Sequence, residues 1–212
     1  MKTSVVTFLS IVTLLAGCNN GDSGSSHKSS KPAPLEQTSG METTNHQGVD
    51  EWPSDVPKIT DPIDLDSWSD NPCDILTNEQ LGNLTINSNP KPGHTKAGPN
   101  CTWGDLTDDG INIGGSLGVS ITSTIPGLYK NNNLGKYAYF DPITINDYPA
   151  VFFGRADDRN HGGCGIAIAL EPSHTYVINL RLHEDYPRYN KPCSVLEDVS
   201  TMAVDTMTQG NS

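Results

Sequence analysis

Residues 164–182 have the sequence CGIAIALEPSHTYVINLRL, from which the class of fold can be inferred. Apolar residues take alternate positions in both halves of it. They are Cys164, Ile166, Ile168 and Leu170 in the first half and Tyr176, Ile178, Leu180 and Leu182 in the second. A period of two is typical of a β-strand that buries one face. The segment 171–174, Glu-Pro-Ser-His, has the composition of a turn, so the sequence predicts two antiparallel strands with one face in water.

The same alternation occurs further toward the N-terminus. Between residues 111 and 123 the odd positions are mostly apolar, and the turn sequence Thr-Asp-Asp-Gly precedes them. Residues 101–106 and 111–122 are therefore predicted to form a β-hairpin. Shorter apolar runs at 143–145 and 150–153 predict two more strands. The glycine-rich segment 114–118 lies within a strand pattern, which favours a β-bulge over a phosphate-binding loop.

Helical patterns flank the predicted strands. Thr77 and Gln80 have the spacing of a capping box, which predicts a short helix near residues 74–83. At the C-terminus the period changes to that of a helix that begins after Asn190 and ends at Gly210. One stripe of that helix carries Val195, Leu196, Val199, Met202, Ala203 and Met207. The expected fold class is α+β, an antiparallel sheet packed with an N-terminal and a C-terminal helix and stabilised by disulfides.

The N-terminal sequence predicts an export signal. Residues 1–17 contain a basic start and a short apolar run, and Leu15-Ala16-Gly17 leads directly into Cys18. This tetrad is a lipobox, so we expect cleavage before Cys18 and lipidation of its thiol, with palmitate as one of the acyl chains. The apolar run is shorter than the roughly 20 residues that cross a bilayer. The predicted location is extracytoplasmic, with the protein anchored to the bacterial cell membrane by its lipid.

Composition divides the rest of the 212-residue chain. Residues 18–50 are poor in large apolar side chains and predict a lipidated N-terminus with a flexible tether. Residues 51–65 contain prolines and predict an extended arm. Residues 66–212 are long enough for a single domain. The chain has 13 basic and 25 acidic residues, a net charge of -12, which argues against nucleic acid as a partner.

Four cysteines remain if Cys18 carries lipid: Cys73, Cys101, Cys164 and Cys193. An even number of cysteines in an exported domain predicts disulfides, whereas the spacing lacks the Cys-x-x-Cys pairs of a zinc site. Three pairings are open. Cys101 and Cys164 begin predicted strands and Cys73 and Cys193 enter predicted helices, so we favour Cys101 with Cys164 and Cys73 with Cys193.

Five short segments occur in a characteristic order: Asn-Pro-Cys-Asp-Ile-Leu-Thr at 71–77, Cys-Thr-Trp at 101–103, Tyr-Pro-Ala-Val at 148–151, Gly-Cys at 163–164 and Pro-Cys at 192–193. In these segments the chain resembles the DUF3558 family of actinobacterial lipoproteins, over about residues 60–209. The resemblance implies a surface lipoprotein of an actinobacterium, and it brings no established activity and no catalytic residues.

The sequence contains no motif of a known catalytic or cofactor-binding type, so no cofactor is expected. The loop with the most candidate ligand-binding side chains is 154–163, where charges of both signs and a histidine lie between glycines. Three interpretations are open for this loop. It could bind a ligand, its arginines and aspartates could pair with one another, or its two aspartates could bind calcium. Its candidate ligand-binding residues are Arg155, Asp157, Asp158, Arg159 and His161.

Two function classes follow from these patterns. The first is a non-enzymatic binding or accessory module of the cell envelope, with an envelope protein, a cell-wall component or a small ligand as its partner. The second is an envelope hydrolase with a site assembled from distant residues such as His161, His174 and an acid. The absence of any nucleophile motif favours the binding module.

Overall fold

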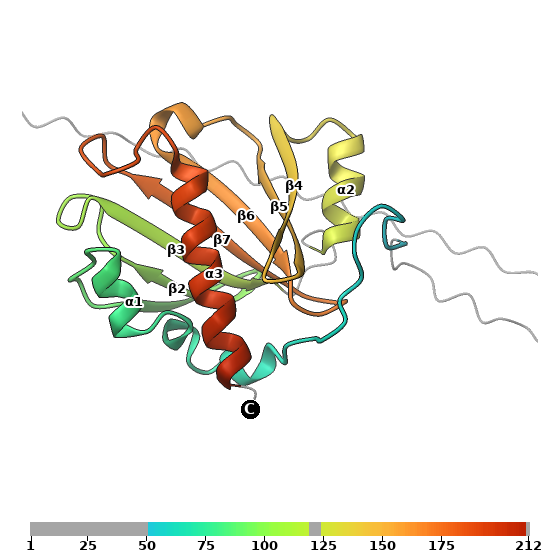
Figure 1. Cartoon of the computed structure of the whole chain (residues 1–212), viewed down its shortest axis with the longest axis horizontal. Coiled ribbons are helices and arrows are strands. Elements are labelled where there is room, and N and C mark those ends of the chain that lie inside the picture. The colour runs from blue at the N-terminus through green and yellow to red at the C-terminus, as the bar shows by residue number, and fades with distance from the viewer. Residues whose placement is uncertain (1–50, 119–123, 211–212) are drawn as a thin grey trace, which may run out of the picture. The chain divides into compact units, whose positions relative to one another are not determined.

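A computed structural model describes residues 51–118 and 124–210. Their centre is a seven-stranded sheet in which each strand is antiparallel to its neighbours (Figure 1). The strand order is β1-β2-β3-β7-β6-β5-β4, so β7 lies in the middle of the sheet. The strands are β1 Lys91–Thr95, β2 Gly98–Trp103, β3 Ile111–Gly118, β4 Tyr139–Ile145, β5 Tyr148–Gly154, β6 Gly163–Ala169 and β7 Thr175–Leu182.

One face of the sheet is covered by helix α3, Pro192–Gly210, which crosses it diagonally (Figure 1). The apolar stripe of α3 packs on the inward residues of β6 and β7, and all of these are buried except Met202, which is partly buried. The predicted hairpin is confirmed as the β2–β3 pair, and the predicted strand pairs appear as β4–β5 and β6–β7. The α+β class and the long C-terminal helix are therefore confirmed.

The N-terminal helix is shorter than predicted. A 3-10 helix η2, Pro72–Ile75, comes first, and then α1 occupies only Asn78–Asn83. Leu76 between them has an extended backbone (φ -114°, ψ 122°), which interrupts the helix. The capping box of α1 forms as expected: the Gln80 amide donates to Thr77 Oγ1 at 3.2 Å, and the Thr77 amide donates to Gln80 Oε1 at 2.8 Å.

One strand and one α-helix were not predicted. Strand β1 has an exposed proline and glycine and no apolar alternation, so its pattern gives no strand signal. Helix α2, Ile125–Asn133, contains Gly127 and ends in three asparagines, which weakens its helical pattern. The available signal was Thr124 followed by Pro126, because the Thr124 side chain caps the helix by accepting from the Gly127 amide at 3.3 Å.

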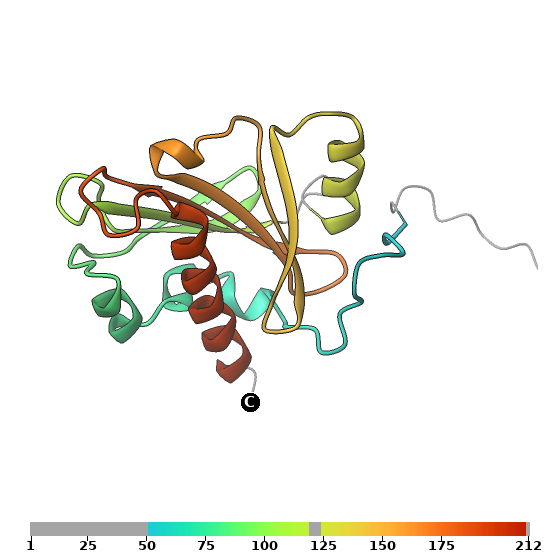
Figure 2. The same ribbon diagram turned by 45° about the horizontal axis from the view of Figure 1, so that its top comes forward.

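Helix α2 lies on the side of the sheet opposite α3 and α1 (Figure 2). It packs on the second face of the sheet, where Val151, Ala167 and Ala169 form a smaller apolar cluster with Ile125 and Leu128. Strand β6 is consequently buried on both faces, and the expectation of one wet face is wrong for this strand. In β7 the expectation holds, since Asn179 and Arg181 are exposed.

Strand β3 contains no bulge among its described residues, because its pairing with β2 and with β7 is continuous. The predicted bulge at 114–118 is therefore wrong, and the glycines have another role. Gly115 faces α3, where an added Cβ would lie 2.9 Å from Trp103 Cζ3 and would overlap the Tyr176 hydroxyl. Gly114 points to the opposite face, where an added Cβ would meet nothing within 4 Å.

The four domain cysteines form two disulfides, but the pairing differs from the one we favoured. Cys73 pairs with Cys101 and Cys164 with Cys193, at Cα separations of 5.1 and 5.3 Å. The sheet order explains the error: β3 and β7 lie between Cys101 on β2 and Cys164 on β6, a gap of about 14 Å at ~4.8 Å per strand. Each bridge instead joins a helix to the strand beneath it.

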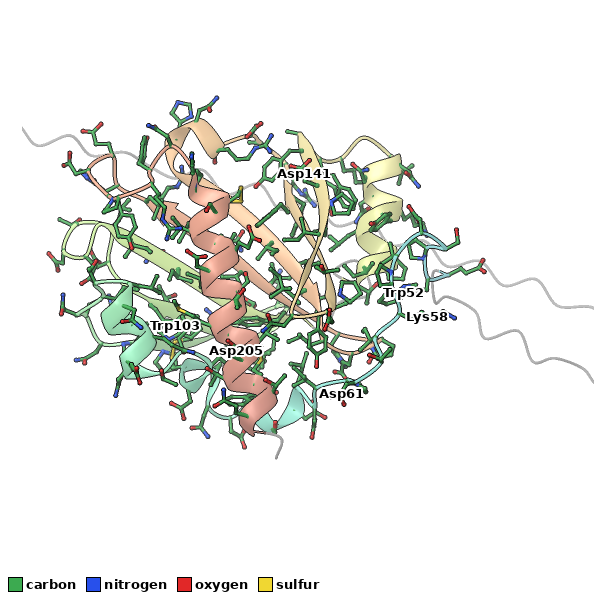
Figure 3. All side chains as sticks on the ribbon, in the orientation of Figure 1. Trp52, Lys58, Asp61, Trp103, Asp141 and Asp205 are labelled. Carbon is green, nitrogen blue, oxygen red and sulfur yellow. A yellow bond between two sulfur atoms is a disulfide. The ribbon has the colours of Figure 1, made fainter. Side chains whose placement is uncertain are left out.

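Residues 51–65 pass the ends of β5 and β6 before the 3-10 helix η1, Asp66–Trp68. The Tyr148 hydroxyl donates to the Asp61 carbonyl at 2.7 Å, and the Ile63 amide donates to the Leu170 carbonyl at 2.9 Å. Figure 3 labels Trp52, Lys58 and Asp61 along this segment. The signal peptide, Cys18 and the tether of residues 18–50 lie outside the described residues. Within the described ranges, no helix has the length and hydropathy to cross a membrane.

Candidate ligand-binding site on the open sheet face

The sheet face opposite α3 carries polar residues and glycines where α2 does not cover it. Alternation places Asn112 and Gly114 of β3 on this face, with Asn179 and Arg181 of β7 beside them. In the register Asn179 lies between Gly114 and Gly165, and Arg181 lies between Asn112 and Gly163. Because its two cross-strand neighbours are glycines, the Asn179 side chain is flanked by backbone alone. We call this part of the sheet face the floor of the site.

One wall of the site forms where β5 separates from β6. The last pair of that ladder is Phe152 with Ile166, so the Gly165 amide has no partner on β5. The Tyr139 hydroxyl replaces it and accepts from the Gly165 amide at 3.1 Å. Burial raises the pKa of Tyr139, which keeps the hydroxyl neutral. The chain after Phe152 is thus free to leave the ladder and border the open face.

A cavity of about 340 Å³ occupies the space between this wall and the polar floor. Asn112, Gly114, Asn179 and Arg181 contribute to the floor, and Phe153 to Asp158, apart from Asp157, contribute to the wall. A volume of this size suits a small molecule or one unit of a larger ligand.

Some charged side chains of the loop after β5 form ion pairs that stabilise the loop itself. Arg159 donates to both carboxylate oxygens of Asp157, at 2.8 and 2.7 Å, and to Asp141 Oδ2 at 2.9 Å. Its guanidinium also lies over the Tyr139 ring, 4.2 Å from the centroid. The Arg159 hydrogen bonds lower the pKa of Asp157 from 3.8 to about 2. These residues hold the loop against Tyr139 and have little capacity left for a ligand.

Arg181 and Arg155 differ in this respect. Arg181 donates to Asp158 Oδ2 at 3.2 Å and to the His161 carbonyl at 3.3 Å, which leaves guanidinium N–H groups unused on a half-exposed side chain. Arg155 is exposed and forms no ion pair or hydrogen bond with any described residue, and it lines the cavity. An unpaired guanidinium on the wall is suited to bind an anionic group bidentately.

The structure therefore divides the five residues expected to bind a ligand. Arg155 and Asp158 line the cavity, whereas Asp157, Arg159 and His161 do not. Sequence reasoning missed the floor residues Asn112, Asn179 and Arg181. Their signal was present, since they occupy the polar positions of strands predicted to have one wet face.

The histidines named for a hydrolase do not come together. His161 precedes β6 and His174 follows it, so the seven residues of that strand separate them by on the order of 20 Å. His174 contacts Ser173 and Glu171, but both contacts are made by Nδ1. A Ser-His-acid triad needs the two ring nitrogens to contact different partners. This exposed turn lacks the geometry of a triad.

Calcium binding by the loop is also disfavoured by its contacts. The Asp157 oxygens accept from Arg159, and Asp158 accepts from Arg181, so both carboxylates already face guanidinium groups. Across residues 51–118 and 124–210 there is no group of three or more His, Cys, Asp or Glu side chains arranged to hold a metal ion.

The chain belongs to the DUF3558 family, whose description is a protein of unknown function. The family model matches residues 13–206, which include the whole sheet and all but the last turn of α3. Comparison with curated proteins gave no significant match. Comparison with solved structures gave none either.

Proposed function

We propose that this protein is a lipid-anchored module of the cell envelope that binds a ligand on the open face of its sheet, without catalysing a reaction. The observation that supports binding most directly is the cavity lined by both Asn179, whose amide lies between two glycines, and Arg155, whose guanidinium is unpaired among the described residues. Neither side chain forms a hydrogen bond or ion pair with another described residue. Binding residues are often carried on loops that a rigid scaffold positions, as the sheet positions the loop that carries Arg155.

The lipid anchor rests on the sequence of residues 1–18 and on the lipobox before Cys18. Two or more acyl chains on Cys18 would hold the protein stably at a bilayer, since each buried methylene contributes about 0.8 kcal/mol. The net charge of -12 does not favour binding to anionic lipid headgroups, so the lipid would supply the attachment. A Cys18→Ser protein is expected to move from the detergent phase to the aqueous phase on partitioning. Retention in the detergent phase would contradict the lipid anchor.

Binding in the cavity is tested by filling it. A Cβ at Gly114 meets nothing within 4 Å, so Gly114→Trp should place an indole over the floor without disturbing the core. Glu197→Trp is the matched control, because Glu197 is exposed on α3, which covers the opposite face of the sheet, and does not line the cavity.

The measurement is mass spectrometry of small molecules that are released by denaturing the full chain after purification from its own membranes. The wild type and Glu197→Trp are expected to release a compound that Gly114→Trp lacks, with all three proteins keeping similar melting temperatures. Identical profiles from the three proteins would contradict a binding role for the cavity. Turnover of an envelope substrate by the wild type would contradict the non-enzymatic assignment.

A further inference from the structure

A second cavity lies beside the first on the open face. It has a volume of about 260 Å³ and is lined by Leu128 of α2, by Lys136 and Tyr137 after α2, and by Val177 of β7. Val177, Asn179 and Arg181 alternate along one face of β7, so both cavities are on the same side of the sheet. Phe153 and Arg155 line both. The two cavities are therefore adjoining sections of one groove, which we call the open-face groove.

The charge of this groove is opposite to that of the protein. Acidic residues outnumber basic ones by 25 to 13 over the whole chain. The open-face groove is lined by three cations, Lys136, Arg155 and Arg181, and by a single acid, Asp158, which accepts a hydrogen bond from Arg181. A positive groove on an acidic surface attracts anionic ligands and rejects competing cations.

The groove also changes in polarity along its length. The first section has the amides of Asn112 and Asn179 on the glycine floor. Asn112 Nδ2 donates to the Gly104 carbonyl at 3.0 Å, which leaves its carbonyl oxygen available, and Asn179 has both a donor and an acceptor available. The second section has the apolar surface of Val177 and Leu128 beside the ring of Tyr137.

The backbone under the groove disfavours a peptide ligand. Strands β3 and β7 are each paired on both sides, so their N–H and C=O groups are already used in ladders. A peptide that binds by strand addition needs an unpaired edge, and β3 and β7 present none. Planar amides that both donate and accept suit neighbouring hydroxyl groups instead.

From these features we infer that the open-face groove binds an acidic oligosaccharide, with sugar hydroxyls on Asn179 and Asn112 and a carboxylate on Arg155. This inference rests on the proposed function and specifies its ligand. Arg155 is the anchor, because it is at the junction of both sections and its guanidinium is unpaired among the described residues. Lys136, whose Nζ donates to Asn131 Oδ1 at 2.8 Å, would add charge beside it.

The experiment is isothermal titration of the full chain in detergent with four probes. They are a hexasaccharide alternating glucuronate and N-acetylglucosamine, the neutral N-acetylglucosamine hexamer, hexaglutamate, and inorganic phosphate. We expect the acidic hexasaccharide to bind at least tenfold more tightly than each of the other three. Its affinity should fall about tenfold in Arg155→Met and about fivefold in Asn179→Leu, and it should fall less in Arg155→Lys than in Arg155→Met.

Lys58→Met is the matched control, because it removes one exposed cation from the segment before the sheet (Figure 3) and Lys58 lines neither cavity of the groove. This variant should bind the acidic hexasaccharide as the wild type does. Equal loss in Lys58→Met and Arg155→Met would overturn the inference, since it would indicate a general charge effect.

The other outcomes separate the ligand class from the proposed function. Equal affinity for the neutral and acidic sugars, or tighter binding of hexaglutamate or phosphate, would overturn the acidic oligosaccharide. If the compound released from the wild type but not from Gly114→Trp is then not a glycan, the binding function is supported and the acidic oligosaccharide is refuted. If the three release profiles are identical, the binding function and the acidic oligosaccharide are both refuted.

Discussion

The Tyr139 hydroxyl accepts a hydrogen bond from the Gly165 backbone amide at 3.1 Å, at the position where β5 separates from β6. A side chain thus takes the place of a missing ladder partner for a buried N–H group. The same ring lies under the Arg159 guanidinium, which binds Asp157 and Asp141. Tyr139 therefore connects the sheet to the wall of the open-face groove.

Removing this hydroxyl should lower stability and loosen the wall. Tyr139→Phe leaves the buried Gly165 amide without an acceptor, at a cost of about 1–3 kcal/mol in the free energy of unfolding. Chemical denaturation measures that loss, and hydrogen exchange at Gly165 should quicken. Tyr137→Phe is the control, because the Tyr137 hydroxyl makes no hydrogen bond with a described residue. Equal effects of the two changes would show that the Tyr139–Gly165 bond is unimportant.

Peptide mapping under non-reducing conditions should recover Cys73 linked to Cys101 and Cys164 linked to Cys193. Replacing Cys164 and Cys193 together by alanine should cost about 3–4 kcal/mol, because the bridge closes a loop of 29 residues in the unfolded chain. Urea denaturation of the oxidised proteins measures the difference. A peptide that joins Cys73 to Cys193 would refute this connectivity.

The two adjacent glycines of β3 should respond differently to alanine. In Gly115→Ala the new methyl group meets Trp103 and the fully buried Tyr176, so we expect a loss of about 1–3 kcal/mol from overpacking. In Gly114→Ala it enters open space, and the thermal midpoint should stay constant or rise slightly. Thermal denaturation of both proteins is the measurement. A larger loss in Gly114→Ala would contradict the assignment of the two faces.

Acid should weaken the contact that holds the loop. Because Arg159 hydrogen bonds lower the pKa of Asp157 to about 2, the folded state favours the carboxylate. The stabilisation is complete above the unfolded value of 3.8 and is lost as the pH falls toward 2. Carboxyl NMR titration should give a higher Asp157 pKa in Arg159→Gln. In Arg181→Gln, which removes the partner of Asp158, the Asp157 pKa should stay low; a rise there would contradict the Arg159 assignment.

Local patterns in the sequence determined most of the secondary structure. The alternation at 164–182 predicted β6 and β7, Thr77 with Gln80 predicted the cap of α1, and the stripe from Val195 to Met207 predicted α3. Each of these signals depends on residues a few positions apart, where backbone geometry alone fixes which side chains share a face. Residues 1–18 predict export and lipidation by the same kind of local reading.

Which strands and which side chains are neighbours in space depends on the tertiary structure. The sequence could not tell that β7 returns to the middle of the sheet between β3 and β6, and this order excludes a Cys101–Cys164 bridge. The same order places Asn179 between Gly114 and Gly165, a juxtaposition of residues from three strands. Contacts between strands distant in sequence depend on the total burial of the whole chain, which no local window contains.

The difference between what the sequence predicts and what the tertiary structure adds is clearest at Arg155 and Arg159. These two arginines of one loop are equivalent in the sequence. Arg159 lies over Tyr139 and binds two carboxylates, whereas Arg155 faces the open-face groove without a partner among the described residues. The sequence determined that this loop would be charged. Only the path of β4, which brings Tyr139 and Asp141 beside Arg159, decided which guanidinium stays free for a ligand, because ion pairs form with whatever lies within a few ångströms in space.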